Sequence, residues 1–339
     1  MPVTSGTVAG HFDGDRAVLR TSNPYLHFRL EARPDGFYQT AVLGAAPDTT
    51  SVSERFDLVV GSGRRGQSYL YWRDDRLYQL PVSYWTELDA WVNSPGYRDG
   101  IANFEREIPP RCLECHATYF ESVADTQTDA TLLSNRYDRD NSILGVSCER
   151  CHGAGREHVE RRRGGSSEWL GSAIVNPAKL PRARQVELCA LCHGGVGEQQ
   201  APAFTYVAGR PLSEYLALDP PGPGEAADVH GNQVGLLARS RCFQASATMT
   251  CSTCHDVHTT QRDAASFSRA CLECHQVQSC GLYPARGVAL ARNCVDCHMP
   301  RLPSNAIVST HEGRPLRPTL RTHWIKVHSN NISDSIANY

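Results

Sequence analysis

The motif Cys-x-x-Cys-His occurs six times in this chain of 339 residues. Its two cysteines lie about one helical turn apart, so each thiol can form a thioether with one vinyl group of the same haem. The histidine that follows then lies next to the iron as the proximal ligand. We therefore predict six covalently attached haem c groups. The predicted thioether cysteines are Cys112, Cys115, Cys148, Cys151, Cys189, Cys192, Cys251, Cys254, Cys271, Cys274, Cys294 and Cys297. The predicted proximal ligands are His116, His152, His193, His255, His275 and His298.

Paired cysteines also build structural zinc sites, in which two pairs usually complete one tetrahedral shell. A zinc site does not explain a histidine directly after every second cysteine. Disulfide frameworks are typical of chains much shorter than this one. Cys242 and Cys280 lie outside the motifs, and for them a 242–280 disulfide and two free thiols are equally compatible with the sequence.

Eight histidines lie outside the motifs, whereas the chain has only three methionines. We therefore predict mostly bis-His axial ligation, which gives lower reduction potentials than His/Met ligation. His258 follows His255 too closely to reach the far face of the same haem, so we expect it to bind a neighbouring haem. Five candidates for six irons leave one distal position open or filled from elsewhere. The candidate distal ligands are His158, His230, His258, His311 and His323, and a solvated or structural role is favoured for His11, His27 and His328.

The formal net charge of the polypeptide is −2. Ionised propionates of six haems would bring the oxidised protein to roughly −8, which makes nucleic acid an improbable partner. Thioether formation requires reduced thiols and haem delivered outside the cytoplasm, so we expect a periplasmic or extracellular protein. The first ten residues do not form a signal peptide, which we expect to have been removed or missed, and no segment is long enough to span a membrane.

The fold class expected is α+β with little regular structure. Residues 1–105 contain no cysteine and are predicted to form an antiparallel β meander, with strands at 26–30, 37–42, 56–60, 67–72 and 76–82. Residues 106–330 carry a haem motif about every 31 residues between positions 112 and 298, a density that favours a haem-cored cytochrome c domain of short helices and loops. Helices are expected at 181–192 and 263–274. Residues 331–339 are interpreted as a tail.

Residues 61–66 match Gly-x-Gly-x-x-Gly, the fingerprint of a dinucleotide-binding loop. That loop must be followed by a helix whose N-terminus holds the pyrophosphate. The residues that follow, 67–72, are aromatic and typical of a strand. A hairpin turn is therefore the favoured interpretation.

Several stretches resemble multihaem c-type cytochromes related to the ammonia-oxidiser tetrahaem cytochrome, hydroxylamine oxidoreductase and pentahaem nitrite reductase. The resemblance is greatest to bacterial proteins that join a multihaem domain to tetratricopeptide repeats. It implies distal roles for His158, His258 and His323, and both ends of the chain fit a piece of a longer protein. The matching stretches are residues 61–65, 67–70, 77–81, 94–97, 148–160 (CERCHGAGREHVE), 176–180, 242–246, 250–258 (TCSTCHDVH) and 293–300 (NCVDCHMP).

The favoured function is electron transfer by hopping between closely packed haems, with redox proteins or membrane electron donors and acceptors as partners. Self-assembly into a conducting filament is a variant of this function. The alternative is a multihaem oxidoreductase acting on a small nitrogen or sulfur compound at one open haem. The Cys-x-x-Cys-Lys motif of pentahaem nitrite reductases does not occur in the sequence, and none of the 13 tyrosines is singled out by position. A haem sensor or interaction module is a third, less favoured class.

Overall fold

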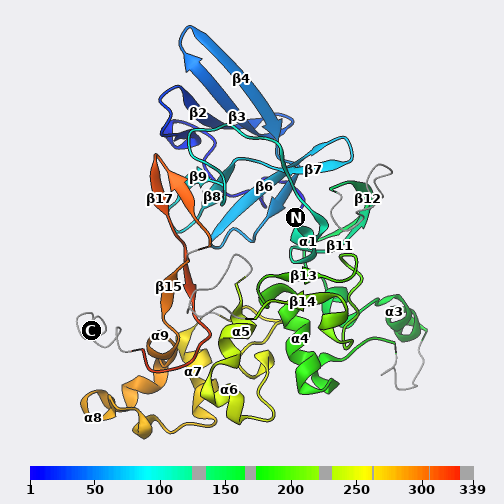
Figure 1. Ribbon diagram of the computed structural model, residues 1–339, viewed down its shortest axis with the longest axis vertical. Helices are drawn as coiled ribbons and strands as arrows, with labels where there is room; N and C mark the ends of the chain where they lie inside the picture. Colours follow the sequence, from blue (N-terminus) through cyan, green and yellow to red (C-terminus); the bar gives the residue numbers. More distant parts are fainter. Residues whose placement is uncertain (124–134, 165–172, 221–230, 262, 305, 329–339) are drawn as a thin grey trace. The chain divides into compact units, whose positions relative to one another are not determined.

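Figure 1 shows the computed structural model, which describes residues 1–123, 135–164, 173–220, 231–261, 263–304 and 306–328. The chain forms two compact units. The first comprises Met1–Arg150, Ala201–Tyr206 and Ile307–Arg317. The second comprises Cys151–Gln200, Val207–Ala306 and Pro318–Tyr339. None of the described helices has the length and the apolar character needed to cross a bilayer.

The first unit begins with a four-stranded antiparallel meander in the order β1 (Val18–Arg20), β2 (Leu26–Arg33), β3 (Gly36–Ala45), β4 (Asp48–Arg55). The apolar residues of β2 alternate with polar ones, and Leu26, Phe28 and Leu30 are all buried. Arg33 pairs with Gly36, so Pro34 and Asp35 form the turn between β2 and β3. Strand β4 was not expected, because nearly all of its side chains are exposed and its sequence has no apolar face.

The second sheet is built on β6 (Gly66–Arg73), with β5 (Leu58–Val60) on one edge. The loop from Gly61 connects these two antiparallel strands, so the Gly-x-Gly-x-x-Gly segment is a hairpin turn and no helix follows it. A Cβ atom on Gly61, whose φ is 102°, would lie 2.7 Å from the Gly66 carbonyl oxygen. Glycine at this position is therefore required by the turn.

A single strand expected at residues 76–82 is divided into β7 (Arg76–Gln79) and β8 (Val82–Trp85), which pair with opposite ends of β6. Pro81 lies at the break and has no amide hydrogen to donate to the ladder. Strands β9 (Ala90–Asn93) and β10 (Arg106–Glu107) complete the sheet, whose order is β10-β7-β6-β8-β9. The residues expected to form one meander therefore form two sheets.

Aromatic side chains fill the core of these sheets. The rings of Phe56 and Tyr69 stack with centroids 4.2 Å apart, and Trp91 is 2% exposed. The Trp91 indole N–H donates to the His11 carbonyl at 2.8 Å. This packing fixes the backbone of β9, including the Trp91 carbonyl oxygen, which accepts a hydrogen bond from His311.

The first unit extends past the expected domain boundary at residue 105. Helix α1 (Pro110–Glu114), which carries the first motif, packs through buried Leu113 in one cluster with Leu58, Leu70 and Leu77. The hairpin of β11 (Ala117–Ser122) and β12 (Tyr137–Leu144) adds Phe120 and Tyr137 to this cluster. Strands β16 (Ser309–His311) and β17 (Arg314–Leu316) also belong to this unit. The expected tail 331–339 lies outside the described residues.

Short helices dominate the second unit. The helices expected at 181–192 and 263–274 are α4 (Arg182–His193) and α7 (Ala264–Leu272). The remaining helices are α2 (Glu149–His152), within which the chain passes between units, α3 (Arg156–Arg163), α5 (Gln233–Ala238), α6 (Arg241–Ala245), α8 (Tyr283–Arg286) and α9 (Val295–His298). The strands are β13 (Gly197–Gln199), β14 (Leu216–Leu218), β15 (Arg301–Pro303) and β18 (Thr319–Arg321). The 3-10 helices of the chain are η1 (Asp15–Ala17), η2 (Pro177–Lys179), η3 (Leu212–Glu214), η4 (Cys251–Thr253), η5 (Val277–Ser279) and η6 (Gly287–Arg292).

The N-terminus of α7 is capped by Asp263, whose carboxylate accepts from the backbone N–H groups of Ala265 at 3.3 Å and Ser266 at 3.2 Å. We expect Asp263→Ala to lower the stability of this helix by about 1 kcal/mol, because an amide loses its partner. Native-state hydrogen exchange of the α7 amides measures this change. Asp263→Asn keeps the acceptor and should exchange like the wild type. Equal protection in the Ala and wild-type proteins would contradict the capping role.

Candidate haem-binding sites

All six Cys-x-x-Cys-His motifs coincide with short helical elements. The first motif begins in α1, which starts at Pro110. The helix ends at Glu114, and Cys115 and His116 follow it directly. The third completes α4, which ends at His193. The motifs at Cys148, Cys251, Cys271 and Cys294 coincide respectively with α2, η4, the end of α7 and α9. A helical turn brings the two cysteines of each motif onto one side, as attachment of one haem requires.

The cysteines are unusually accessible. Unpaired cysteine is among the most often buried residues in folded proteins, yet all fourteen are half-buried or exposed, and all are free thiols. Cys242 and Cys280 are also free thiols, so the structure has no disulfide between them. No group of three or more His, Cys, Asp and Glu side chains in the described ranges is arranged to hold a bare metal ion. The accessibility fits thiols that face a prosthetic group.

Thiols of successive motifs lie next to one another in the second unit. Cys189 and Cys251 share a side-chain hydrogen bond, and this bond raises the pKa of the Cys189 thiol above its usual value. The charge of Cys151 acts on Cys189 in the same direction. Burial, and the neighbouring thiols of Cys294 and Cys254, raise the pKa of Cys271 to about 11. The third and fourth motifs, and the fifth and sixth, are therefore neighbours in the second unit.

Two pairs of histidine rings lie close together in the second unit. The centroids of His152 and His258 are 6.1 Å apart, and those of His255 and His323 are 6.2 Å apart. Both pairs have an interplanar angle of 27°. An imidazole nitrogen binds a first-row metal ion at about 2.0–2.1 Å, so the ring centroids of two trans ligands are expected about 6 Å apart. The residues present therefore fit bis-His haem iron at these two positions.

Three histidines are oriented by backbone carbonyls. The Nδ1 atoms of His152, His298 and His311 lie 2.8 to 2.9 Å from the carbonyl oxygens of Val175, Lys326 and Trp91, respectively. A carbonyl oxygen can only accept, so Nδ1 carries the proton and the lone pair of Nε2 is available. Metal-binding histidines in proteins are held in this way. His311 comes from β16 in the first unit, where it is a candidate ligand in a fixed orientation.

The remaining candidates differ in their surroundings. Burial lowers the pKa of His323 to about 4, so its ring is neutral near pH 7 and can bind a metal ion. His158 lies on α3, which begins after Gly155, and its buried Nδ1 has no hydrogen-bond partner in the described structure. His230 lies outside the described residues.

Two of the disfavoured histidines use their Nε2 atoms within the protein. His11 Nε2 lies 2.8 Å from Asp89 Oδ1 and 3.2 Å from the Tyr84 hydroxyl. His328 Nε2 lies 3.3 Å from the Trp324 carbonyl oxygen. His27 is on β2. Its pKa is lowered mainly by burial and, to a smaller extent, by the positive charges of Arg20 and Arg29. These contacts agree with a structural role for His11 and His328.

A buried ion pair joins the first two motifs and was not anticipated. Glu114 lies between Cys112 and Cys115, and Arg150 lies between Cys148 and Cys151. Their side chains are 6% and 8% exposed, with Nη2 and Oε1 3.3 Å apart. Glu114 also pairs with Arg111 at 2.9 Å. The signal in the sequence was a charged residue at an x position of each motif.

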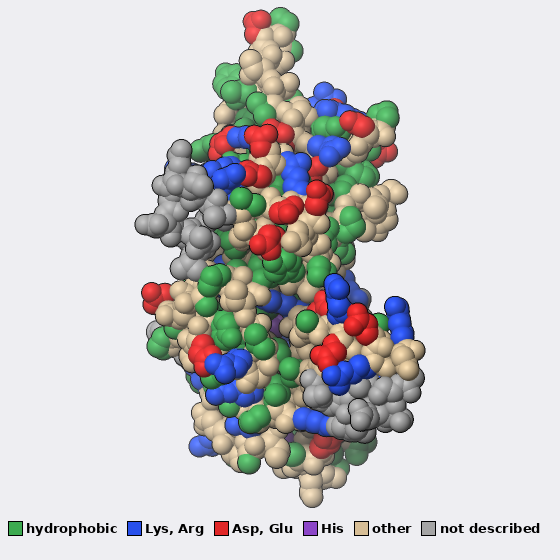
Figure 2. Space-filling view, turned by 90° about the vertical axis from the view of Figure 1, so that its right-hand side faces the viewer, with side chains coloured by type: hydrophobic (Ala, Val, Ile, Leu, Met, Phe, Trp, Pro, Cys, Tyr) green, Lys and Arg blue, Asp and Glu red, His purple; other side chains and the backbone are tan. Residues whose placement is uncertain are grey.

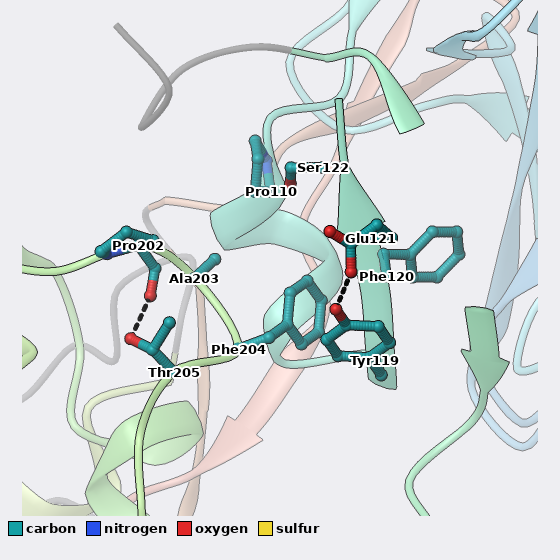
Figure 3. A pocket seen from close by; sticks show the side chains of 9 residues that line it. All are labelled: Pro110, Tyr119, Phe120, Glu121, Ser122, Pro202, Ala203, Phe204 and Thr205. Atoms are coloured by element: carbon teal, nitrogen blue, oxygen red, sulfur yellow. Dashed lines mark hydrogen bonds between the residues drawn. The ribbon is translucent and has the colours of Figure 1, made fainter. Parts of the chain in front are cut away.

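The cavity drawn in Figure 3 lies beside the first motif, within the first unit. Tyr119, Phe120 and Phe204 are among its lining residues, and the Tyr119 hydroxyl donates to Glu121. Its lining, as far as the chain is described, includes none of the predicted thioether cysteines or iron ligands.

A family profile described as cytochrome c554 and c-prime matches residues 96–153. The matched segment contains the first two Cys-x-x-Cys-His motifs and the ion pair that joins them. The match supports a c-type multihaem cytochrome. It implies covalently attached haem c and a role in electron transfer. No curated protein and no solved structure matches the chain, so the expected relationship to hydroxylamine oxidoreductase and nitrite reductase stays a prediction.

Proposed function

We propose that this chain is a hexahaem electron carrier in which electrons hop between closely packed, mostly bis-His haems. The observation that carries the proposal is the spacing of the two facing histidine pairs, 6.1 and 6.2 Å between ring centroids. An iron held by two imidazoles has no free position for a substrate. Such a site is suited to electron transfer and not to catalysis on a bound molecule.

Haem c supplies a one-electron Fe(III)/Fe(II) couple when bound. The protein would hold each haem at a fixed position and keep the orientation of its histidine ligands constant. Paired cysteines would anchor each group through two bonds, and carbonyl oxygens orient His152 and His298. Firm ligation in both redox states lowers the reorganisation that accompanies each electron transfer.

The composition of the second unit supports a haem-cored fold. Both clusters of buried hydrophobic side chains in the described chain belong to the first unit. The buried apolar residues of the second unit are few and scattered, namely Ala190, Leu191, Ala208, Leu212, Leu216, Leu236 and Val295. Porphyrin rings would supply the apolar surface that side chains do not, and the neighbouring thiols would bring successive rings close together.

We propose a periplasmic or extracellular location, where thioether attachment takes place, and redox proteins or membrane-bound donors and acceptors as partners. Acidic and basic side chains are intermixed over the face shown in Figure 2. That pattern differs from the continuous basic surface typical of nucleic-acid-binding proteins. The alternative, an oxidoreductase with one open iron, depends on the count of five candidate distal histidines for six irons.

The proposal is tested by maturing the protein with haem in a bacterial periplasm and measuring its mass and its low-temperature EPR spectrum. We expect six haems per chain and low-spin ferric signals only. The double variant Cys112→Ser, Cys115→Ser should lose one haem and is the control for the count. A high-spin signal equal to one haem per chain would favour the oxidoreductase, and nitrite, hydroxylamine and sulfur oxyanions would then be assayed.

A further inference from the structure

The C-terminal strap, residues 322–326, touches two candidate haem sites. His323 faces His255, the proximal ligand of the fourth motif. The Lys326 carbonyl accepts from Nδ1 of His298, the proximal ligand of the sixth motif, at 2.9 Å. Backbone bonds from Thr322 N to the Pro300 carbonyl and from Lys326 N to the His298 carbonyl hold the two ends of the strap.

Within the strap, the Trp324 N–H donates to Thr322 Oγ1 at 3.2 Å, and the Arg239 guanidinium lies 5.2 Å from the centroid of the Trp324 ring. The middle of the strap is also held by the side chain of Ser240. Its hydroxyl donates to the His323 carbonyl at 3.1 Å and accepts from the Ile325 N–H at 2.8 Å. Ser240 is 0% exposed. Its own backbone is tied to the helices on either side, because its N–H donates to Leu237 and its carbonyl accepts from Gln244 N. A fully buried hydroxyl thus fixes the backbone on both sides of the histidine.

We infer that Ser240 is a positioning residue that holds His323 in place as the distal ligand of the haem attached at Cys251 and Cys254. The inference deepens the proposed function and rests on the bis-His ligation proposed there. As far as the chain is described, the ring of His323 makes one hydrogen bond, and it is long, with 3.3 Å between Nδ1 and the Arg321 carbonyl oxygen. His152 and His298, by contrast, are oriented by ring contacts of 2.8 and 2.9 Å. The orientation of His323 therefore depends on its backbone, which Ser240 holds.

Ser240→Ala removes both contacts and leaves the Ile325 N–H without its partner. Loss of such a supporting hydrogen bond typically weakens a metal–ligand interaction about 10- to 100-fold. Added imidazole should then replace His323 at one haem per chain, with an apparent affinity about 10- to 100-fold higher than for any haem of the wild type. The haem count should not change, because the thioethers do not depend on the strap.

The matched control is Ser94→Ala in the first unit. Ser94 is also 0% exposed, and its hydroxyl donates to the Leu80 carbonyl at 2.8 Å, between residues that belong to no haem motif. This variant loses a buried hydroxyl of the same kind, so a general loss of stability would appear in both proteins. Only Ser240→Ala should bind imidazole more tightly.

The experiment records EPR and visible spectra of the fully loaded proteins during an imidazole titration. Tighter binding at one haem in Ser240→Ala alone supports the inference. Identical titrations of wild type and Ser240→Ala, in a wild type that is fully low-spin, overturn it and leave the proposed function standing. A wild type without low-spin bis-His signals overturns both.

If Ser240→Ala does not mature, Ser240→Thr and Ser240→Val are compared in the same titration. Threonine and valine have the same shape, but only threonine keeps the hydroxyl. Tighter binding in Val than in Thr supports the inference, and equal binding overturns it.

Discussion

His258→Ala is expected to turn one of the six haems from low-spin to high-spin. The ring of His258 faces His152 at 6.1 Å, and its removal leaves the iron at His152 with a single protein ligand. The side chain of His258 is 76% exposed, so its loss should cost little folding stability. EPR spin counting of the oxidised protein measures the change, and carbon monoxide should bind one haem per reduced chain. The mass should still show six haems.

The control for this prediction is His11→Ala. The Nε2 atom of His11 lies 2.8 Å from Asp89 Oδ1 in the first unit, so this histidine has a role within the protein. Its removal should leave the spin state of every haem unchanged. If the His258 variant keeps a fully low-spin spectrum, the facing rings are not the two ligands of one iron.

Glu114→Gln is expected to lower the free energy of unfolding by about 3–5 kcal/mol, the usual cost of removing one partner of a buried ion pair. The carboxylate is 6% exposed and lies between Arg111 and Arg150, both of which would lose their counter-charge. It also accepts a hydrogen bond from the Phe204 backbone N–H at 2.9 Å. Urea unfolding at equal haem content, followed by circular dichroism, measures the difference.

Glu87→Gln is the matched control, because Glu87 pairs with Arg65 at 3.0 Å where both side chains are about half exposed. Exposed pairs contribute about 0–1 kcal/mol, so this variant should unfold nearly as the wild type does. Equal losses in the two variants would show that the Glu114 pair is not specially important. A loss confined to Glu114→Gln would show that the ion pair between the first two motifs stabilises the fold.

Features encoded by short stretches of sequence were the most predictable. The alternation Leu26, Phe28, Leu30 indicated β2, and Asp263 ahead of a helix-compatible run indicated the start of α7. The aromatic run after Gly66 distinguished the hairpin from a dinucleotide loop, because a strand and a helix differ in residue type at that place. Each of these signals lies within a few residues of the element it predicts.

Features that depend on distant residues were not predictable in the same way. The histidine pairs combine residues that are far apart in the sequence, and only the fold decides which rings come together. Ser240 is an ordinary serine in the sequence, and its role depends on the return of residues 323–325 to its side. Strand β4 is polar and exposed on both faces, so burial leaves no pattern in its sequence, although Thr49, Thr50 and Val52 have β-forming side chains.

Synthesis from the N-terminus delivers His152 long before His258, and His255 long before His323. In both facing pairs the second ring belongs to a later part of the chain. If these pairs bind iron as proposed, the growing chain would pass through stages in which attached haems lack their second ligand, and such irons would be open to oxygen and to small anions. The site of His255 would be completed only when His323 is made, so a chain that stops before His323 would carry a reactive iron in place of a fully coordinated one.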